Sequence, residues 1–216
     1  IKSLSGITIS QIAVAENHCL AISSNGDLYA WGSNKYGQLG HGSDKSTSCA
    51  DPQPVKALKK QYIVGIAAGH HHSLAFNDEG ELWLWGSNER GQLGQNLTGS
   101  GSIAWVPKQL WIGNKKVQTQ ILQVSASLYC SLVLRERPSG GGVDGGSTGY
   151  SSNGLSNEQL NKQTSEVFQL GHGSYSPIRV TFSTDVGVAA RDKDKDKDKD
   201  TASTSRIRGC STRRAI

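Results

Sequence analysis

Three consecutive histidines, His70, His71 and His72, are the residues whose type is best suited to chemistry, because imidazole binds metals and transfers protons. Successive side chains of a strand point to opposite faces, so only His70 and His72 would share a side. No cysteine, aspartate or further histidine stands beside them at ligand spacing. His72 also has a counterpart, His18, at the same place in an earlier segment. We therefore expect a buried structural imidazole here and no metal site.

Two pairs of glycines have a spacing that could suggest a phosphate-binding loop: Gly37 with Gly40, and Gly91 with Gly94. A P-loop also requires Lys followed by Ser or Thr and then a helix, and neither follows here. The sequence contains no Ser-His-Asp or Cys-His constellation and no acid and base carboxylate pair. It therefore predicts no enzyme active site and no cofactor, although a longer parent protein could carry a fused catalytic domain.

An internal repeat, offset by 54 residues from Gly26 to Gly80, organises the chain around these positions. Gly26–Gly40 reads GDLYAWGSNKYGQLG, and Gly80–Gly94 reads GELWLWGSNERGQLG. The match extends backwards, from IAVAENHCLAI in the first copy to IAAGHHHSLAF in the second. Short apolar blocks separated by Gly-containing turns at this period predict four-stranded propeller blades.

The second copy is the clearest one for placing strands. We expect them at Ile63–Ala68, His72–Phe76, Leu82–Trp85 and Val106–Leu110, with a turn at 77–80 and a long polar loop at 87–105. The first copy has the equivalent loop at 33–52.

The pattern G-[DE]-L-x-x-W-G-S-N-x-x-G-Q-L-G resembles the regulator of chromosome condensation repeat, and the resemblance covers Ile7–Leu134. It implies an all-β fold, namely about two and a half four-stranded blades of a seven-bladed β-propeller. Each repeat tryptophan would then lie buried between adjacent blades, with its indole N–H hydrogen-bonded. The repeat-structural residues would be Gly26, Trp31, Gly32, Gly37, Gly40, His18, Gly80, Trp85, Gly86, Gly91, Gly94 and His72.

The chain departs from this pattern after Leu134. A low-complexity insertion is expected at 135–166, either as a surface loop or as translated intron, replacing or interrupting the strand that carries Trp. Gln169–Gly173 (QLGHG) then matches the loop sequence that begins at Gln38, so 167–183 is interpreted as a remnant of a further repeat. Residues 1–134 would hold the propeller repeats, and 184–216 a disordered Asp/Lys and Arg-rich tail.

Charge and cysteine content limit the partners and the compartment. The net charge is +5, but residues 191–216 carry nine Lys/Arg and five Asp, a net charge of +4, which leaves +1 for the rest of the chain. The repeats therefore have no strong sequence-level footprint of nucleic-acid binding. The four cysteines form no CxxC pair, which favours a reduced cytoplasmic or nuclear location. No apolar run approaches the ~18 residues that span a membrane. A start at Ile1 instead of Met suggests a fragment of a longer protein.

The sequence predicts a protein–protein interaction module of a larger signalling or ubiquitin-ligase scaffold. The variable loops Lys45–Lys60 and Asn96–Trp105 would carry specificity, with Trp105 and Trp111 as candidate partner contacts. The alternative is guanine-nucleotide exchange on a Ran-like small GTPase, which the resemblance implies because the founding family member has this activity. The family that the sequence resembles also includes a plant UV-B photoreceptor. This chain has His70 and Glu16 at the positions where the photoreceptor motif requires Trp, which argues against photoreception by these blades.

Overall fold

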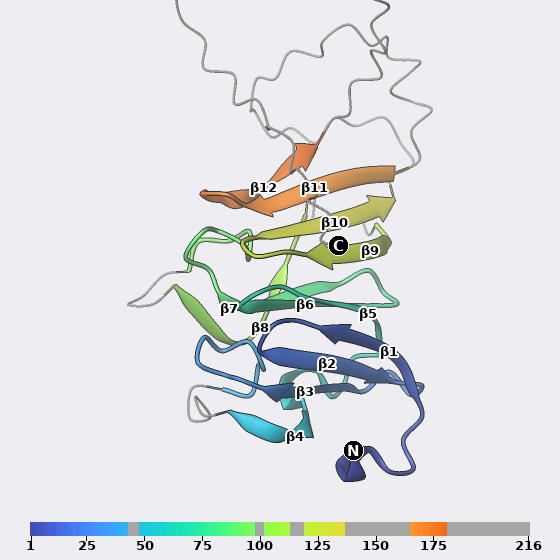
Figure 1. Cartoon of the computed structure of the whole chain (residues 1–216). Coiled ribbons are helices and arrows are strands. Elements are labelled where there is room, and N and C mark those ends of the chain that lie inside the picture. The colour runs from blue at the N-terminus through green and yellow to red at the C-terminus, as the bar shows by residue number, and fades with distance from the viewer. Residues whose placement is uncertain (43–47, 98–101, 113–118, 137–164, 181–216) are drawn as a thin grey trace, which may run out of the picture. The chain divides into compact units, whose positions relative to one another are not determined.

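The computed structural model describes residues 1–42, 48–97, 102–112, 119–136 and 165–180, all within one compact unit, Ile1–Phe182 (Figure 1). The described chain is all-β and forms three four-stranded antiparallel sheets, each with its strands hydrogen-bonded in chain order. The expected fold class is therefore confirmed. The interior of the predicted insertion and the tail lie outside the described residues.

The three sheets are named blades 1, 2 and 3 in chain order (Figure 1). Blade 1 contains β1 (Ile9–Val14), β2 (His18–Ser23), β3 (Leu28–Gly32) and β4 (Cys49–Pro54). Blade 2 contains β5 (Ile63–Ala68), β6 (His72–Asn77), β7 (Leu82–Ser87) and β8 (Ile103–Leu110). Blade 3 contains β9 (Ile121–Ala126), β10 (Cys130–Glu136), β11 (Ser165–Gly171) and β12 (Ser174–Val180). The short helix η1 (Lys2–Leu4) precedes blade 1, and η3 (Lys56–Leu58) connects blades 1 and 2.

The predicted strands of blade 2 all exist, and β8 begins three residues earlier than expected, at Ile103. The turn between β6 and β7 is closed by Asn77, whose Oδ1 accepts hydrogen bonds from the backbone N–H groups of Glu79 and Glu81. Gly80 completes this turn with φ of 81°, a value that favours glycine. The repeat signature thus encodes the hairpin through local turn chemistry.

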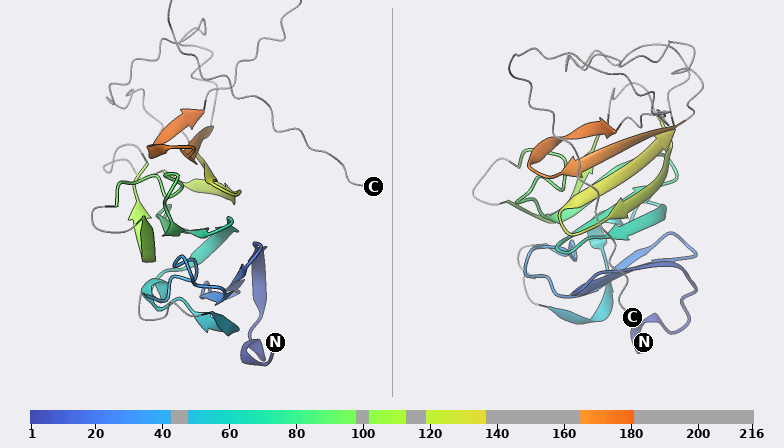
Figure 2. Two further views of the ribbon diagram at one scale, coloured as in Figure 1. Left: turned by 60° about the vertical axis from the view of Figure 1, so that its left-hand side comes forward. Right: turned by 45° about the horizontal axis from the view of Figure 1, so that its top comes forward.

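Adjacent blades lie face to face (Figure 2). One apolar core of buried residues runs through all three blades. Leu20, Leu74, Leu84 and Val133 are fully buried in it. Burial of such side chains contributes about 2 kcal/mol each. A blade face is therefore stable mainly through its contact with the next blade.

A short polar chain crosses the interface between blades 1 and 2. His18 Nε2 of blade 1 lies 2.9 Å from Ser73 Oγ of blade 2, and the Ser73 hydroxyl donates to the Gln38 carbonyl of blade 1 at 2.8 Å. The indole N–H of Trp85 donates to the same carbonyl at 2.9 Å. Trp85 is fully buried, so this hydrogen bond satisfies an indole that water does not reach.

The interface between blades 2 and 3 repeats this arrangement with one change. His72 Nε2 lies 2.8 Å from Ser131 Oγ, whose hydroxyl donates to the Gln92 carbonyl at 2.9 Å. The place of tryptophan is taken by Leu170, which is fully buried but whose side chain has no N–H to donate. The polar chain between blades 2 and 3 therefore lacks the indole hydrogen bond of the chain between blades 1 and 2.

Blade 3 corrects the expected alignment of the third repeat. Gly171 pairs with Cys130 as Gly32 pairs with His18, so Leu170–Gly171 occupies the Trp–Gly place of the strand. The expected match of Gln169–Gly173 to the loop that begins at Gln38 is therefore wrong. The strand register decides which residues of the third repeat are equivalent to Trp and Gly, and a local sequence match does not contain this register. Blade 3 therefore has a complete third strand, β11.

The predicted insertion begins where the other blades make a tight turn. In blade 2 the last strand pair is Phe76 with Leu82, and its counterpart in blade 3 is Leu134 with Val167. Strands β10 and β11 continue for two more pairs, ending at Glu136 with Ser165. A hairpin needs about two connecting residues, so removing 137–164 as a whole would break the last pairs.

A buried ion-pair network holds the base of this hairpin. Arg135 is 2% exposed, and its Nη2 lies 3.0 Å from Glu166 Oε2. Glu166 Oε1 lies 2.8 Å from Arg179 Nη2 of β12, and the Arg135 guanidinium stacks over the Phe168 ring at 4.7 Å. Glu166 is the member shared by both ion pairs, so removing it would leave the buried Arg135 guanidinium without its carboxylate partner.

The tautomer of His18 and His72 follows from the interface hydrogen bonds. Each serine hydroxyl gives its one proton to a carbonyl, so each histidine must donate from Nε2 and keep Nδ1 unprotonated. Both Nδ1 atoms are buried without a partner among the described residues. Burial, followed by the nearby His71 and His70 charges, lowers the pKa of His18 to about 4. Burial also lowers the pKa of His72 to about 3, and the neighbouring histidines add to this effect.

We expect Trp85→Leu to lower the free energy of unfolding by about 3 kcal/mol, because it removes a buried ring and leaves the Gln38 carbonyl with one donor. The matched control is Trp31→Leu, at the same repeat position but half-buried in blade 1. Urea unfolding followed by far-UV circular dichroism measures both. Equal losses in the two variants would contradict a special role for the interface.

Glu166→Ala should destabilise blade 3 by about 3 kcal/mol, since Arg135 would remain buried without its carboxylate. The control is Glu136→Ala, an exposed carboxylate on the same strand pair. Hydrogen exchange of the β10–β12 amides reports the change locally. Similar protection of these amides in both variants would show that the network contributes little.

Stability should fall with pH below about 6.5, where histidine in the unfolded chain begins to bind protons that folded His18 and His72 do not. The contribution of the two neutral histidines to the free energy of unfolding is fully present above this pH. It is lost progressively towards pH 4, by at most about 1.4 kcal/mol per pH unit for each histidine. Urea midpoints between pH 7.5 and 5.5 test this above the range of ordinary carboxylates. The slope should become shallower in His18→Gln, and a flat profile of the unmodified chain would count against neutral buried histidines.

Candidate functional site

The predicted repeat residues occupy equivalent places in blades 1 and 2. Gly32 and Gly86 follow the tryptophans with φ of 107° and 101°, and a side chain at Gly32 would meet the Asn17 carbonyl. The loop glycines also have positive φ, and they face protein atoms instead of open space: Gly37, Gly40, Gly91 and Gly94. This geometry gives a backbone reason for glycine at these positions.

The two repeat tryptophans differ in their surroundings. Trp85 lies buried between blades 1 and 2, as expected, whereas Trp31 is half-buried. The expectation of a buried ring is wrong for Trp31, because the face of blade 1 that carries it is not covered by another described blade. Ile12 and Val14 of β1, which belong to the same sheet, are exposed as well.

The two candidate partner-contact tryptophans lie near the outer strand of blade 2. Trp105 lies within β8 and is half-buried, so the expected loop position is wrong. Trp111 follows the end of β8 and is 45% exposed. A role of either residue in partner binding stays a prediction.

Aromatic and charged side chains gather where the first hairpins of the three blades and the loops after β3 and β7 come together. The β1–β2, β5–β6 and β9–β10 turns lie at the same end of their blades as these loops, because neighbouring strands are antiparallel. We name this region the tip surface, and its residues are Glu16, Lys35, Tyr36, His70, His71, Glu89, Arg90, Leu128 and Tyr129.

Ring stacking connects blade 1 to blade 2 on the tip surface. The Tyr36 ring stacks on His71 with centroids 4.1 Å apart, and His71 stacks on His70 at 3.7 Å. His70 Nε2 lies 2.7 Å from Glu16 Oε2 of the β1–β2 turn. Burial lowers the pKa of His71, and the charge of His70 lowers it further. These contacts order side chains that would otherwise be free to rotate.

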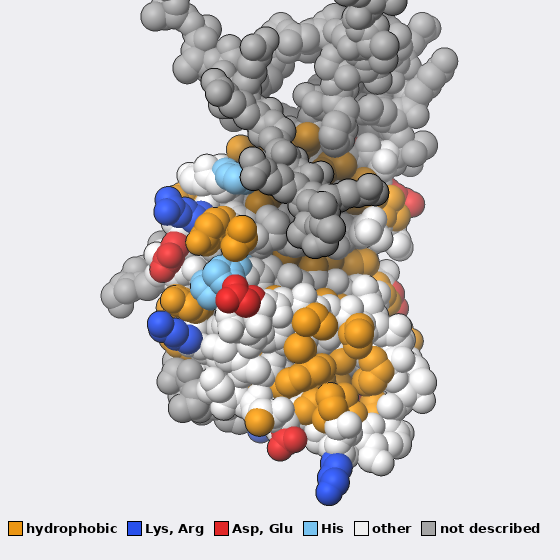
Figure 3. All heavy atoms as spheres, in the orientation of Figure 1, with side chains coloured by type: hydrophobic (Ala, Val, Ile, Leu, Met, Phe, Trp, Pro, Cys, Tyr) orange, Lys and Arg blue, Asp and Glu red, His pale blue; other side chains and the backbone are white. Residues whose placement is uncertain are grey.

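This row of ring contacts, from Tyr36 through His71 to His70, continues into blade 3 through Tyr129. Its ring meets His70 edge-on, with centroids 6.4 Å apart, and the Arg90 guanidinium lies 5.9 Å from its centroid. At the opposite end, Lys35 Nζ lies 5.4 Å from the Tyr36 ring centroid. Leu128 and Tyr129 remain 59% and 42% exposed. Figure 3 shows histidine and acidic side chains in contact at this surface, with cationic side chains on either side.

Sequence reasoning placed specificity in Lys45–Lys60 and Asn96–Trp105 and missed the tip surface. Its residues come from turns and loops more than 100 residues apart, from Glu16 to Tyr129, and only the packing of blades brings them together. One signal was available. Between the first two copies, the tip residues differ while the residues around them match, as in Lys35–Tyr36 against Glu89–Arg90.

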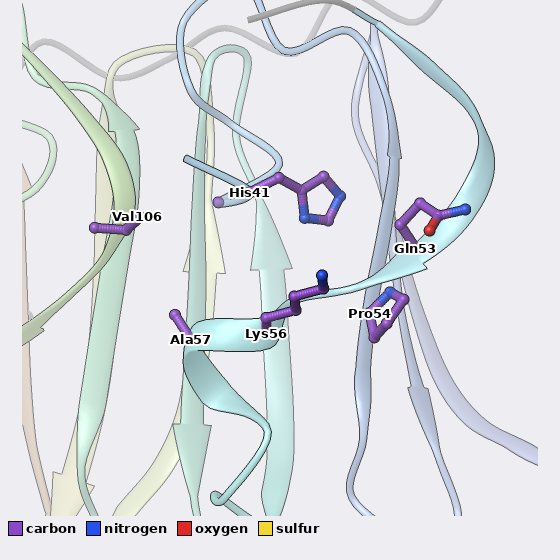
Figure 4. Close-up of a pocket in the computed structure, with 7 residues that line it drawn as sticks. His41, Gln53, Pro54, Lys56, Ala57 and Val106 are labelled. Atoms are coloured by element: carbon purple, nitrogen blue, oxygen red, sulfur yellow. The ribbon is translucent and has the colours of Figure 1, made fainter. Parts of the chain in front are cut away.

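A small hollow lies elsewhere, between β4, η3 and β8 (Figure 4). The His41 ring and the Lys56 side chain point into it, with Gln53 on the opposite wall. His41 Nε2 lies 3.3 Å from the Ala30 carbonyl. Across the described ranges, no group of three His, Cys, Asp or Glu side chains is placed to hold a metal ion. The described part of the chain also contains no helix long and apolar enough to cross a membrane.

Comparison with curated proteins gives relatives of the repeat region. The human protein named probable E3 ubiquitin-protein ligase HERC4 is 46% identical over 98 residues, which is 44% of this chain and 9% of that protein. The ultraviolet-B receptor UVR8 of Arabidopsis thaliana is 40% identical over 94 residues, which is 44% of this chain and 21% of that protein. The chain therefore spans a small part of these relatives.

The solved structure of Prp20p from Saccharomyces cerevisiae has a similar fold, with a TM-score of 0.56 at 20% sequence identity. The similarity covers 82% of this chain and 39% of Prp20p. A family model for the regulator of chromosome condensation (RCC1) repeat matches residues 25–76 and 79–134. A second model of the same repeat matches 9–38 and 63–92. The chain belongs to the regulator of chromosome condensation (RCC1) repeat family.

Proposed function

We propose that this chain is a protein-interaction module of a larger RCC1-repeat protein, and that the tip surface carries its partner specificity. The observation that supports this most directly is the exposed pair Leu128 and Tyr129, held beside Arg90 at the junction of blades 2 and 3. Tyrosine and arginine are enriched among residues that dominate binding energy in protein interfaces. The positions lie in turns and loops, where a rigid scaffold usually carries recognition.

The interaction scaffold fits the relatives named as E3 ligases and as a light receptor. The name of HERC4 describes a whole protein, and this chain spans only 9% of it. We therefore propose a ligase activity only for a longer parent protein and not for this chain. We place the module in the cytoplasm or nucleus, which agrees with free Cys19, Cys49 and Cys130. Burial raises the pKa of the Cys19 and Cys130 thiols, so these two cysteines are not activated nucleophiles.

A second candidate function is guanine-nucleotide exchange on a Ran-like small GTPase. The observation that favours it is the fold similarity to Prp20p, which was described together with its binding properties to Gsp1p and histones. Exchange needs surfaces that displace a bound nucleotide and requires no catalytic triad. The 20% identity to Prp20p supports the fold alone, so we rank exchange below the interaction module.

Replacing Leu128 and Tyr129 together with alanine should remove most of the specific partners captured by the full chain, because both side chains are exposed anchors. Quantitative mass spectrometry of partners captured from an extract measures the loss. The control is Leu122→Ala on β9, which is also exposed, at 46%. The same partner set with both proteins would argue against the tip surface as the recognition site.

Release of labelled GDP from Ran separates the two functions. An interaction module without exchange activity should leave the release rate unchanged at micromolar concentrations of the chain. Acceleration that disappears in the Leu128 and Tyr129 double variant would instead support exchange through the tip surface.

A further inference from the structure

Resting on the proposed function, we propose that the tip surface recognises an acidic protein segment with an apolar anchor. Carboxylates of the partner pair with Lys35 and Arg90, and the anchor side chain packs against Leu128 and Tyr129. The partner segment is thus defined by apolar residues that are flanked by acidic residues.

Charge pairing on the surface supports an acidic partner. The Glu16 carboxylate is already engaged by His70 Nε2 at 2.7 Å. Lys35 and Arg90 lie over aromatic rings and make no ion pair with another described residue. A guanidinium that stacks on a ring keeps its N–H edge available to a carboxylate. Two cations therefore remain for an incoming ligand, one at each end of the row.

The apolar part of the surface lies at the Arg90 end. Leu128 and Tyr129 stand next to each other in the β9–β10 turn, and Tyr175 of β12, which is 41% exposed, reaches the Glu89 carbonyl with its hydroxyl at 3.4 Å. The rings of the row are held by mutual contacts before any partner arrives. Preorganised aromatic side chains lose little conformational entropy on binding.

A carboxylate beside Arg90 opposes an acidic ligand. Glu89 precedes Arg90 in the loop after β7 and is exposed. Its charge also acts on His71, where it favours the protonated form. Removing this carboxylate should therefore improve binding of an acidic partner, whereas removing Arg90 should weaken it. The proposal therefore predicts opposite changes in affinity for two neighbouring substitutions. A variant that had lost its fold would not bind the acidic partner more tightly, so a gain of affinity cannot result from misfolding.

The test uses the full chain and a fluorescein-labelled peptide in which glutamates flank a central Leu-Trp pair. A matched peptide with glutamine in place of glutamate is the neutral probe. Fluorescence anisotropy should show binding of the acidic peptide only, with affinity falling as salt rises. We expect Arg90→Gln to weaken binding by about fivefold and Glu89→Gln to strengthen it by about twofold.

Matched controls are Lys60→Gln, in the connection before β5, and Glu136→Gln, at the end of β10. Both are exposed charges at the end of the blades opposite the tip surface, so they should leave the affinity unchanged. Equal effects at Arg90 and Lys60, or preference for the neutral peptide, would overturn the proposal. Binding of a single-stranded DNA twelve-mer in place of the peptide would also overturn it. If the acidic peptide fails while partner capture still depends on Leu128 and Tyr129, the acidic chemistry is wrong and the interaction module stands.

Discussion

The backbone carbonyl of Gln38, and its counterpart at Gln92, is the acceptor on which the contact between blades depends. The loop presents this carbonyl because it is closed on itself: Asn34 Oδ1 accepts from the Leu39 N–H at 2.9 Å, and Gln38 Oε1 accepts from the Tyr36 N–H at 2.8 Å. The following blade then supplies a serine hydroxyl, and at the first interface an indole N–H. Since an unpaired buried carbonyl is costly, loop and blade order each other.

The same loops carry part of the tip surface, namely Lys35, Tyr36, Glu89 and Arg90. Gln92 Oε1 fixes the backbone of Arg90 through its N–H at 2.9 Å, in the way that Gln38 fixes Tyr36. Tyr36 and Arg90, which belong to the proposed recognition surface, therefore stand on a backbone that the interface already holds. Because the rings come from different blades, the stacked row exists only where the blades are assembled. Assembly of the blades and the order of the tip surface thus share one set of contacts, which explains how short turns can hold a fixed arrangement of exposed side chains.

Much of the fold followed from the sequence, because the features that define a blade are local. Gly80 and the neighbouring turn residues predict the hairpin, and the Trp-Gly pair predicts the third strand of blades 1 and 2. Blade 3 was misaligned at Leu170, since a buried position tolerates leucine where the pattern has tryptophan, and only strand pairing reveals the equivalence. The tip surface was not predicted, because it depends on contacts between turns distant in sequence, such as His71 with Tyr36.

The polar chain between blades has a direction. The preceding blade always contributes histidine and the loop carbonyl, and the following blade always contributes serine. Blade 2 carries both partners, His72 and Ser73, so two copies of it placed in tandem are complementary without further change, whereas two placed head to head are not. A gene segment that encodes such a blade and is copied whole would add a compatible neighbour at once, while a segment cut within a blade would separate donor from acceptor. The orientation of these bonds thus favours growth of the array by duplication of entire repeats in one direction.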